Sequence, residues 1–331
     1  MKFSLVICTY QRPKALITLL DSVEKQTLYP NEIIIVDGSL DAASKMALDN
    51  KTFKNLSYYL VSDAHRGLTK QRNFGISKVA KESEIVCFLD DDTILENNYF
   101  EELINTYHNY PEALAIGGYI GNEVGWEQSN RALTKSEYGF DGYIRKEGSR
   151  FVLRKQLGLV DKTKPGFMPK FSNGRSVSYL PPSGKIYEVE QLMGGVASYR
   201  KEVFQKLQFS TYFEGYGLYE DADFSLRVAK EGKLYINTAA QLEHHHEPSG
   251  RPNQYQYGKM VVRNGWYVWN VKYPKPSLNA RFKWNAIVLL LIGIRFTNIF
   301  TTNKRKEAFT EASGRLLGWF SLFLNKPKVE K

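Results

Sequence analysis

The first 90 residues alternate short apolar runs with stretches of helical periodicity, and this alternation constrains the fold more than any other feature. The apolar runs cover residues 3–8, 32–36, 56–61 and 85–89. Helix-like segments follow the first three runs, at residues 13–23, 42–48 and 69–80. Strands that alternate with helices build a parallel sheet with helices on its faces. We therefore expect an α/β fold with a mostly parallel central sheet flanked by helices.

Three consecutive aspartates, Asp90, Asp91 and Asp92, directly follow the fourth apolar run. They would lie at the carboxyl end of a strand, where open α/β sheets bind their ligands. Crowded carboxylates raise one another's pKa unless a cation offsets their charge. Oxygen ligands suit Mg²⁺ or Mn²⁺. The triplet therefore predicts a metal site that could hold a diphosphate, with a solvated acidic turn as the alternative.

Charge is unevenly distributed along the 331 residues. Residues 251–331 carry 15 basic and three acidic side chains, whereas the first 250 residues are nearly neutral. Such asymmetry predicts an anionic surface as partner of the C-terminal segment, either a membrane or a nucleic acid. No recognisable nucleic-acid motif occurs, so we expect no nucleic-acid partner. Cys8 and Cys87 both lie inside apolar runs and are expected to be reduced core thiols.

The C-terminal segment, residues 251–331, combines apolar stretches with tryptophans and cations. Residues 286–294 are nine consecutive apolar residues, which is too short to span a bilayer. This pattern is typical of a mainly helical region that lies in the membrane interface. The alternative is a helical subdomain or a dimer contact. The sequence leaves open whether the protein forms a homo-oligomer. Because no secretory signal opens the chain, we expect a cytoplasmic protein, peripheral on the inner face of the cell membrane.

Residues 121–187 are rich in glycine, lysine, proline and aromatics, and their periodicity is weak. We interpret them as a loop-rich insertion over the active face of a domain that covers residues 1–250. Order returns after residue 188, with a turn and strand at residues 194–199, a helix at 221–231 and a last strand at 234–236.

Several motifs follow one another in a definite order between residues 3 and 251. They are Cys8-Thr9-Tyr10-Gln11-Arg12-Pro13, Gln26, Glu32-Ile33-Ile34-Ile35-Val36-Asp37, Arg72-Asn73-Phe74-Gly75-Ile76, the aspartate triplet, Gly194-Gly195, Arg200-Lys201-Glu202-Val203-Phe204 and Glu220-Asp221-Ala222-Asp223-Phe224-Ser225-Leu226-Arg227. Together they resemble the family 2 inverting glycosyltransferases, which have the GT-A fold. One departure is the run Val36-Asp37-Gly38-Ser39, which is one residue shorter than is usual in that family.

The resemblance implies roles for the donor-side residues. Asp92 would bind the metal ion, Asp90 would lie near the ribose and base, and Asp91 would be their neighbour. His244 would complete the metal shell, with His246 as the second choice. The remaining donor-side residues would contact the base, ribose or phosphates of the nucleotide; they are Thr9, Tyr10, Arg12, Asp37 at the edge of the base, and Arg72.

The resemblance also implies roles for the acidic pair in the second half. Asp221 would be the general base that takes the proton of the acceptor hydroxyl, and Glu220 would orient the acceptor. An acidic helix N-terminus, favoured by the helix dipole, is the alternative for this group.

The implied reaction moves a sugar from a UDP- or dTDP-sugar to a hydroxyl of a glycan or lipid-linked saccharide, with inversion and with Mn²⁺ or Mg²⁺ as cofactor. Polysaccharide biosynthesis is the expected context. Two alternatives remain: a nucleotidyltransferase that makes an activated sugar, and a non-catalytic membrane-surface binding protein. The first usually has a glycine-rich phosphate loop near its N-terminus, and the run from Thr9 to Pro13 has none.

Overall fold

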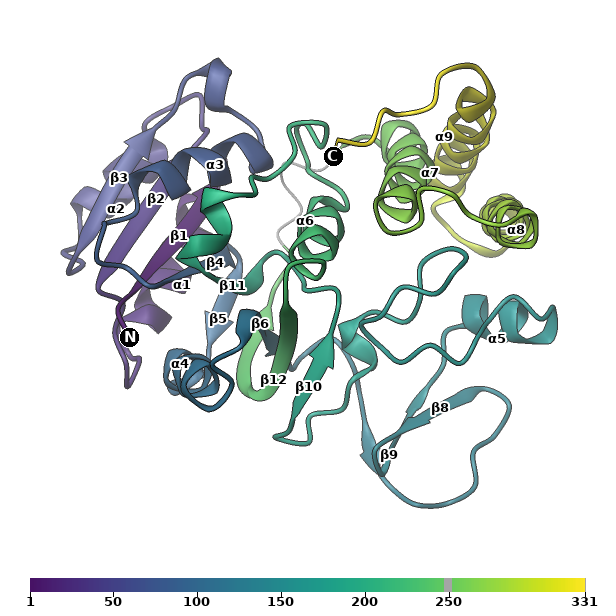
Figure 1. Cartoon of the computed structure of the whole chain (residues 1–331). Coiled ribbons are helices and arrows are strands. Elements are labelled where there is room, and N and C mark those ends of the chain that lie inside the picture. Colours follow the sequence, from purple (N-terminus) through teal and green to yellow (C-terminus); the bar gives the residue numbers. More distant parts are fainter. Residues whose placement is uncertain (247–251, 331) are drawn as a thin grey trace. The chain divides into compact units, whose positions relative to one another are not determined.

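The computed structural model describes residues 1–246 and 252–330. The chain divides into two compact units (Figure 1). Unit 1 consists of Met1–Gly125 and Leu180–Gly250, and unit 2 consists of Trp126–Tyr179 and Arg251–Lys331. The residues of the insertion thus group largely with the C-terminal segment, to which they are not adjacent in sequence.

The first half of the unit 1 sheet is parallel, as predicted. Its strands are β1 (Phe3–Thr9), β2 (Glu32–Asp37), β3 (Leu56–Leu60) and β4 (Ile85–Asp90), in the order β4-β1-β2-β3. The register places Thr9 beside Asp37 and Cys8 beside Asp90. The carboxyl ends of these strands therefore meet at one edge of the sheet, where the predicted site residues gather.

The second half of this sheet is mixed. Strand β11 (Val196–Arg200) runs antiparallel between β4 and β6 (Ala113–Ile120), and β12 (Lys233–His244) is parallel to β6. Strand β10 (Ile186–Val189) pairs with the first part of β12, and β5 (Thr93–Leu95) pairs with its last part. The prediction of a last strand at 234–236 was too short, because β12 continues through a register shift to His244.

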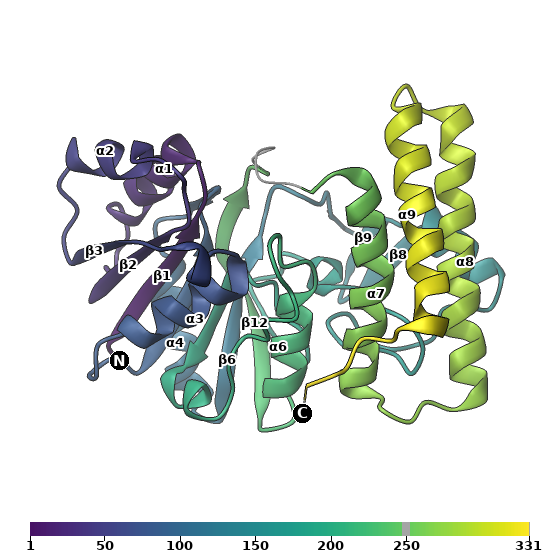
Figure 2. The same ribbon diagram turned by 90° about the horizontal axis from the view of Figure 1, so that it is seen from above.

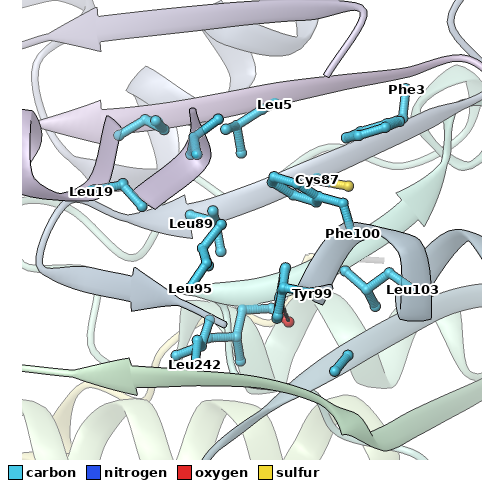
Figure 3. Close-up of a cluster of buried hydrophobic side chains, with 14 of the residues drawn as sticks. Phe3, Leu5, Leu19, Cys87, Leu89, Leu95, Tyr99, Phe100, Leu103 and Leu242 are labelled. Atoms are coloured by element: carbon cyan, nitrogen blue, oxygen red, sulfur yellow. Dashed lines mark hydrogen bonds between the residues drawn. The ribbon is translucent and has the colours of Figure 1, made fainter. Parts of the chain in front are cut away.

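Helices cover both faces of the parallel half (Figure 2). Leu5 belongs to a buried cluster with Leu19 of α1 (Pro13–Val23) and Tyr99 of α4 (Tyr99–Asn109), as Figure 3 shows. Since successive side chains of a strand point to opposite faces, Val6 lies on the other face. There it meets α3 (Leu68–Lys78), where a Cβ on Gly75 would lie 2.5 Å from Val6 Cγ1. The glycine of the Arg72-Asn73-Phe74-Gly75 motif therefore allows α3 to lie close to the sheet.

The remaining helices in the described part of unit 1 are α2 (Ala43–Asp49) and α6 (Glu220–Val228), with short 3₁₀ turns at Asp63–His65 and Lys201–Gln205. Both cysteines are free thiols, as expected. Cys87 is buried in the core, whereas Cys8 is only partly buried.

Unit 2 contains three long helices and a small antiparallel sheet, which confirms a helical C-terminal region. The helices are α7 (Gln254–Lys272), α8 (Leu278–Thr301) and α9 (Arg305–Leu324). The sheet has the order β7 (Glu127–Gln128), β9 (Tyr143–Lys146), β8 (Glu137–Phe140), and α5 (Ser149–Gln156) follows it. The Trp269 indole N–H donates to the carbonyl of Lys170 at 3.0 Å, which ties α7 to the insertion.

Helices α7 and α9 approach each other through glycines. A Cβ on Gly314 would lie 2.0 Å from the Tyr255 carbonyl oxygen, and one on Gly258 would lie 2.2 Å from that of Glu311. Gly314 and Gly318 stand four residues apart, the spacing of small residues that lets two helices make close backbone contact.

Helix α8 is longer than the apolar run at 286–294 predicts. It has 24 residues and a best 18-residue window of mean hydropathy 1.5, of which 17% is buried. Among the described residues it is the single helix long and apolar enough to cross a membrane. The prediction that this segment is too short for a crossing was therefore wrong, because the helix continues through Arg281 and Lys283 on one side and past Arg295 on the other.

Candidate active site

A cavity of about 580 Å³ opens in unit 1 at the carboxyl ends of β1 and β4. Its volume falls within the roughly 300–1,000 Å³ of sites for small molecules and cofactors. The predicted residues that line it are Thr9, Tyr10, Arg12, Arg72, Asp90, Asp91, Glu220 and Asp221. Side chains from both halves of unit 1 therefore face one space.

Asp91 is buried and held by the end of β1. It accepts hydrogen bonds from Thr9 Oγ1 at 2.6 Å and from Arg12 Nη1 at 3.0 Å. Burial raises the pKa of Asp91 to about 6, although Arg12 and Thr9 oppose the shift. Arg12 Nη1 also lies 3.6 Å from Asp92 Oδ2, so one guanidinium serves two carboxylates of the triplet.

Asp90, Asp92 and His244 form a group that could hold a metal ion, with one ligand atom from each within 4.8 Å of the others. The pairing of β12 with β5 places His244 beside Thr93, next to the triplet. His244 Nε2 lies 3.1 Å from Asp92 Oδ1. Two carboxylates and one imidazole form a donor set that divalent transition metals accept.

The metal-free imidazole of His244 is strongly basic. Burial disfavours its charged form, but hydrogen bonds to Asp92 and Glu123 and the nearby carboxylate charges raise the pKa of His244 to about 10. A bound cation would replace this proton, because metal ligation requires the neutral ring.

His246, the second choice for the metal shell, belongs to a neighbouring group with Glu123 and His244. Its Nε2 lies 2.9 Å from Glu123 Oε1, and His244 Nδ1 lies 3.3 Å from the same oxygen. His244 is common to both groups and the only histidine of the group that contains Asp90 and Asp92. Sequence reasoning missed Glu123, for which no motif offers a signal.

Arg72 links the metal group to the acidic pair. Its guanidinium forms an ion pair with Glu220 and lies 3.6 Å from Asp90 Oδ1. It also stands over the rings of Phe209 and Phe88, at 5.2 and 5.6 Å from their centroids. Burial raises the pKa of Glu220 to about 8, while the Arg72 charge opposes this. A guanidinium placed between two carboxylates fixes the distance between the two halves of the site.

Asp221 lies beside this pair at the start of α6. Its Oδ2 accepts the Gly194 N–H at 3.2 Å, and its Oδ1 accepts the Ala222 N–H at 2.7 Å. Burial raises the pKa of Asp221, and the two backbone hydrogen bonds act in the opposite direction. An oriented carboxylate with a raised pKa suits a general base.

Gly194 and Gly195 separate the two groups of acids. A Cβ on Gly195 would lie 2.1 Å from Asp90 Oδ2. A Cβ on Gly194 would lie 2.6 Å from Glu220 Oε1 and 2.7 Å from Arg72 Nη1. The carboxylates can therefore approach the backbone of this segment only because it carries no side chains.

Asp37 lies at the carboxyl end of β2, as expected. It is buried and is not among the described residues that line the cavity. Its oxygens accept hydrogen bonds from the Tyr58 hydroxyl and the Ser39 N–H, both at 2.8 Å. These two hydrogen bonds brace Asp37 at the end of β2, and each of its oxygens keeps a second lone pair. The contact of Asp37 with the edge of the base stays a prediction.

Several lining residues were missed by sequence reasoning. Gln71 donates through Nε2 to the carbonyls of Thr9 and Val36, at 3.1 and 2.8 Å, and so ties the ends of β1 and β2 together. Its position just before Arg72 was the available signal. Gly215 and Gly217 also line the cavity and have φ of 66° and 73°. The alternating glycines of this loop could have indicated a tight turn beside the acidic pair.

The fold and site define a glycosyltransferase, and comparisons with known proteins agree. The family model described as glycosyl transferase family 2 matches residues 4–172. The uncharacterized glycosyltransferase YwdF of Bacillus subtilis is 33% identical over 235 residues, which cover 71% of this chain and 70% of YwdF. The chain therefore belongs to glycosyl transferase family 2.

Other similarities are more local. The glucosyl-dolichyl phosphate glucuronosyltransferase of Haloferax volcanii is 32% identical over 123 residues, 36% of this chain and 38% of that protein. The chain thus matches about two fifths of that relative's length. The crystal structure of GalNAc-T7 with UDP, GalNAc and Mn²⁺ superposes with a TM-score of 0.50 at 18% identity, over 80% of this chain and 48% of that one. This likeness concerns the fold, which is the GT-A fold.

Proposed function

We propose that this protein is an inverting glycosyltransferase that moves a sugar from a UDP- or dTDP-sugar to a hydroxyl of a glycan or lipid-linked saccharide. The observation that carries the proposal is the cavity shared by Asp90, a member of the candidate metal group, and Asp221, the candidate base. Its volume of about 580 Å³ suits a nucleotide-sugar. The names of the relatives are consistent with this, since one acts on a dolichyl phosphate lipid and the GalNAc-T7 structure contains UDP.

Asp90, Asp92 and His244 would hold the divalent cation, for which we propose Mn²⁺ or Mg²⁺. When bound, such an ion supplies positive charge that stabilises a departing diphosphate. The imidazole in the group favours Mn²⁺ over Mg²⁺, which binds almost entirely through oxygen. Thr9, Tyr10 and Arg12 would form the nucleotide side of the cavity, and Arg12 would keep Asp91 and Asp92 in place.

Asp221 would take the proton of the acceptor hydroxyl. As the acceptor oxygen bonds to the anomeric carbon, the bond from that carbon to the diphosphate oxygen breaks, and the configuration inverts. The N–H groups of Gly194 and Ala222 hold the Asp221 carboxylate in one orientation. Glu220, fixed by Arg72, would help to orient the acceptor.

Substitution of the proposed base tests this assignment. In Asp221→Asn we expect turnover to fall by about 10²–10⁴-fold, the usual contribution of general base catalysis, with donor affinity nearly unchanged. Turnover is measured by product formation and donor affinity by calorimetry with Mn²⁺ present. Asp49→Asn, at the exposed end of α2, is the matched control and should behave like the wild type. Unchanged turnover in Asp221→Asn would remove Asp221 as the base.

We further propose that the protein is peripheral on the cytoplasmic face of the cell membrane. Unit 2 supports this with its basic C-terminal segment and with large apolar side chains that lie exposed on α8 and α9. They are Leu278, Phe282, Leu289, Phe300, Phe309, Leu317, Phe320, Phe323 and Leu324. Apolar surface beside cations is typical of helices at an anionic membrane surface.

A further inference from the structure

A second cavity, of about 170 Å³, lies within unit 2 where α5, α8 and α9 meet. Three arginines line it, one from each helix: Arg150, Arg295 and Arg315. The other lining residues are Ser149, Asn298, Leu291 and Ile294. None of these residues belongs to the candidate active site.

The cavity carries more positive charge than the protein neutralises. The buried carboxylate of Glu311 forms ion pairs with Arg295 Nε at 3.0 Å and with Arg315 Nη2 at 2.7 Å. One carboxylate thus faces two guanidiniums. Arg150 has no ion-pair partner among the described residues and adds a third. Three guanidiniums thus face one carboxylate around this cavity, and the surplus of positive charge favours an anionic ligand.

The neutral groups around the cavity are also suited to an anion. Ser149 and Arg150 are the first two residues of α5, where the backbone N–H groups have no partner inside the helix and the helix dipole attracts negative charge. The Ser149 hydroxyl and the Asn298 amide can donate as well. Guanidinium groups match the oxygens of a phosphate in two-pronged hydrogen bonds.

Volume and surroundings narrow the choice of anion. A cavity of about 170 Å³ exceeds the roughly 30 Å³ that one water occupies but is smaller than the roughly 300 Å³ at which sites for larger ligands begin. It fits a phosphate group rather than a nucleotide-sugar. Leu291 and Ile294 line it, and Leu289 of α8 and Leu317 of α9 are exposed. A phosphate on a lipid would find apolar contacts there that a free phosphate would not use.

We propose that this arginine-lined cavity binds the phosphate of an anionic lipid headgroup at the membrane surface. The inference rests on the proposed membrane association and adds a defined site to it. Arg150 is the most informative position, because it is exposed and its replacement breaks no ion pair among the described residues. Arg281, exposed on α8 and not part of the cavity lining, is the matched control for loss of one positive charge.

The full chain is tested by sedimentation with phosphatidylcholine vesicles that contain either phosphatidic acid or oleate at equal surface charge. We expect about tenfold tighter binding to phosphatidic acid, a preference that Arg150→Gln removes and Arg281→Gln keeps. A general charge effect alone would weaken binding about fivefold in both variants and on both vesicles. Inorganic pyrophosphate, added as a soluble competitor, distinguishes a lipid from a free phosphate.

Three results would overturn the proposal. The first is equal binding to both vesicles at equal surface charge, which would leave membrane association intact and remove the phosphate site. The second is an equal loss of preference in the two variants. The third is binding of pyrophosphate that is as tight as that of phosphatidic acid vesicles and is lost in Arg150→Gln, which would assign the cavity to a soluble anion. None of these measurements depends on glycosyl transfer, so their failure is separate from failure of the proposed activity.

Discussion

Replacement of Gly195 by alanine isolates the contribution of Asp90 to the candidate metal group. The new Cβ would lie 2.1 Å from Asp90 Oδ2 and 2.3 Å from its Cγ. The backbone cannot yield, because the Gly195 carbonyl accepts the Asp90 N–H at 3.1 Å and β11 pairs with β4 over its whole length. The side chain of Asp90 must therefore turn away, and its exposed fraction of 39% leaves solvent to turn into.

The expected loss follows from this displacement. Removing one supporting partner of a metal ligand costs about 10–100-fold in affinity, and displacing a ligand should cost at least that much. We expect Mn²⁺ affinity to fall by about 10–100-fold, which is about 1.4–2.7 kcal/mol. Because Asp90 is half-exposed, the free energy of unfolding should fall by no more than the roughly 1–3 kcal/mol typical of overpacking.

Mn²⁺ titration followed by calorimetry gives the affinity, and urea unfolding of the metal-free protein gives the stability. Gly125→Ala is the matched control in unit 1, since a Cβ there would have no atom within 4 Å. It should bind Mn²⁺ like the wild type. If Gly195→Ala also binds Mn²⁺ with wild-type affinity and turns over normally, Asp90 is not a ligand and the metal group is wrong.

Two further predictions concern pH and helix contact. Mn²⁺ affinity should rise up to about tenfold per pH unit below pH 10, since the pKa of His244 is raised to about 10 and its proton must leave on binding. Mn²⁺ titrations at pH 6, 7 and 8 measure this slope, which His244→Gln should flatten. An Mn²⁺ affinity of the wild type that does not change with pH would contradict the prediction. Gly314→Ala should lower the free energy of unfolding by about 1–3 kcal/mol, because its Cβ would lie 2.0 Å from the Tyr255 carbonyl oxygen. In urea unfolding Gly293→Ala, with no atom within 4 Å, should be harmless, and equal midpoints for the two variants would refute the contact.

The parallel half of the sheet was predictable because strands buried on both faces consist of continuous apolar runs. The runs at 3–8, 32–36 and 85–89 are of this kind, and β1, β2 and β4 match them within a residue. The end of β12 was not predictable in this way. After Ile236, the polar residues Asn237 and Thr238 interrupt the apolar pattern where the pairing with β6 shifts register, so only the first part of β12 looked like a strand.

The candidate metal group was found in part. Asp92 and His244 followed from the resemblance, which placed Asp90 near the ribose and base instead. Glu123, in the neighbouring group, lies 3.3 Å from His244 Nδ1, although it stands 121 residues before His244 and belongs to no motif. It is brought near by the parallel pairing of β6 with β12. Next to it, Asn122 donates to the His244 carbonyl at 3.1 Å and accepts the His244 N–H at 3.0 Å. Contacts of this kind arise because β6 and β12 end side by side, and the spacing of residues in the sequence does not indicate which strands are neighbours.

For Asp37, the position was predictable from the sequence, whereas the hydrogen-bond partners of its side chain were not. Its position at the end of β2 was correctly predicted, and the role was carried over from the resemblance. What could not be read is the direction of the side chain, which is set by Tyr58 on β3 and by the Ser39 N–H. The register of β2 with β3 places Tyr58 two residues from the partner of Asp37, which brings the hydroxyl within reach. Residue type and strand end are therefore insufficient to assign a ligand contact when a neighbouring strand offers a donor.

Two adjacent glycines directly before β11, Gly194 and Gly195, explain why one site contains side chains from both halves of unit 1. Without side chains at Gly194 and Gly195, Asp90 lies against one residue and the Arg72–Glu220 ion pair against the other. The Gly194 N–H then remains free of steric cover and donates to Asp221. The same two residues thus set the spacing between the metal group and the base. Substitution of Gly195 should mainly lower metal affinity. Substitution of Gly194 should mainly disturb the Arg72–Glu220 ion pair and the orientation of Asp221.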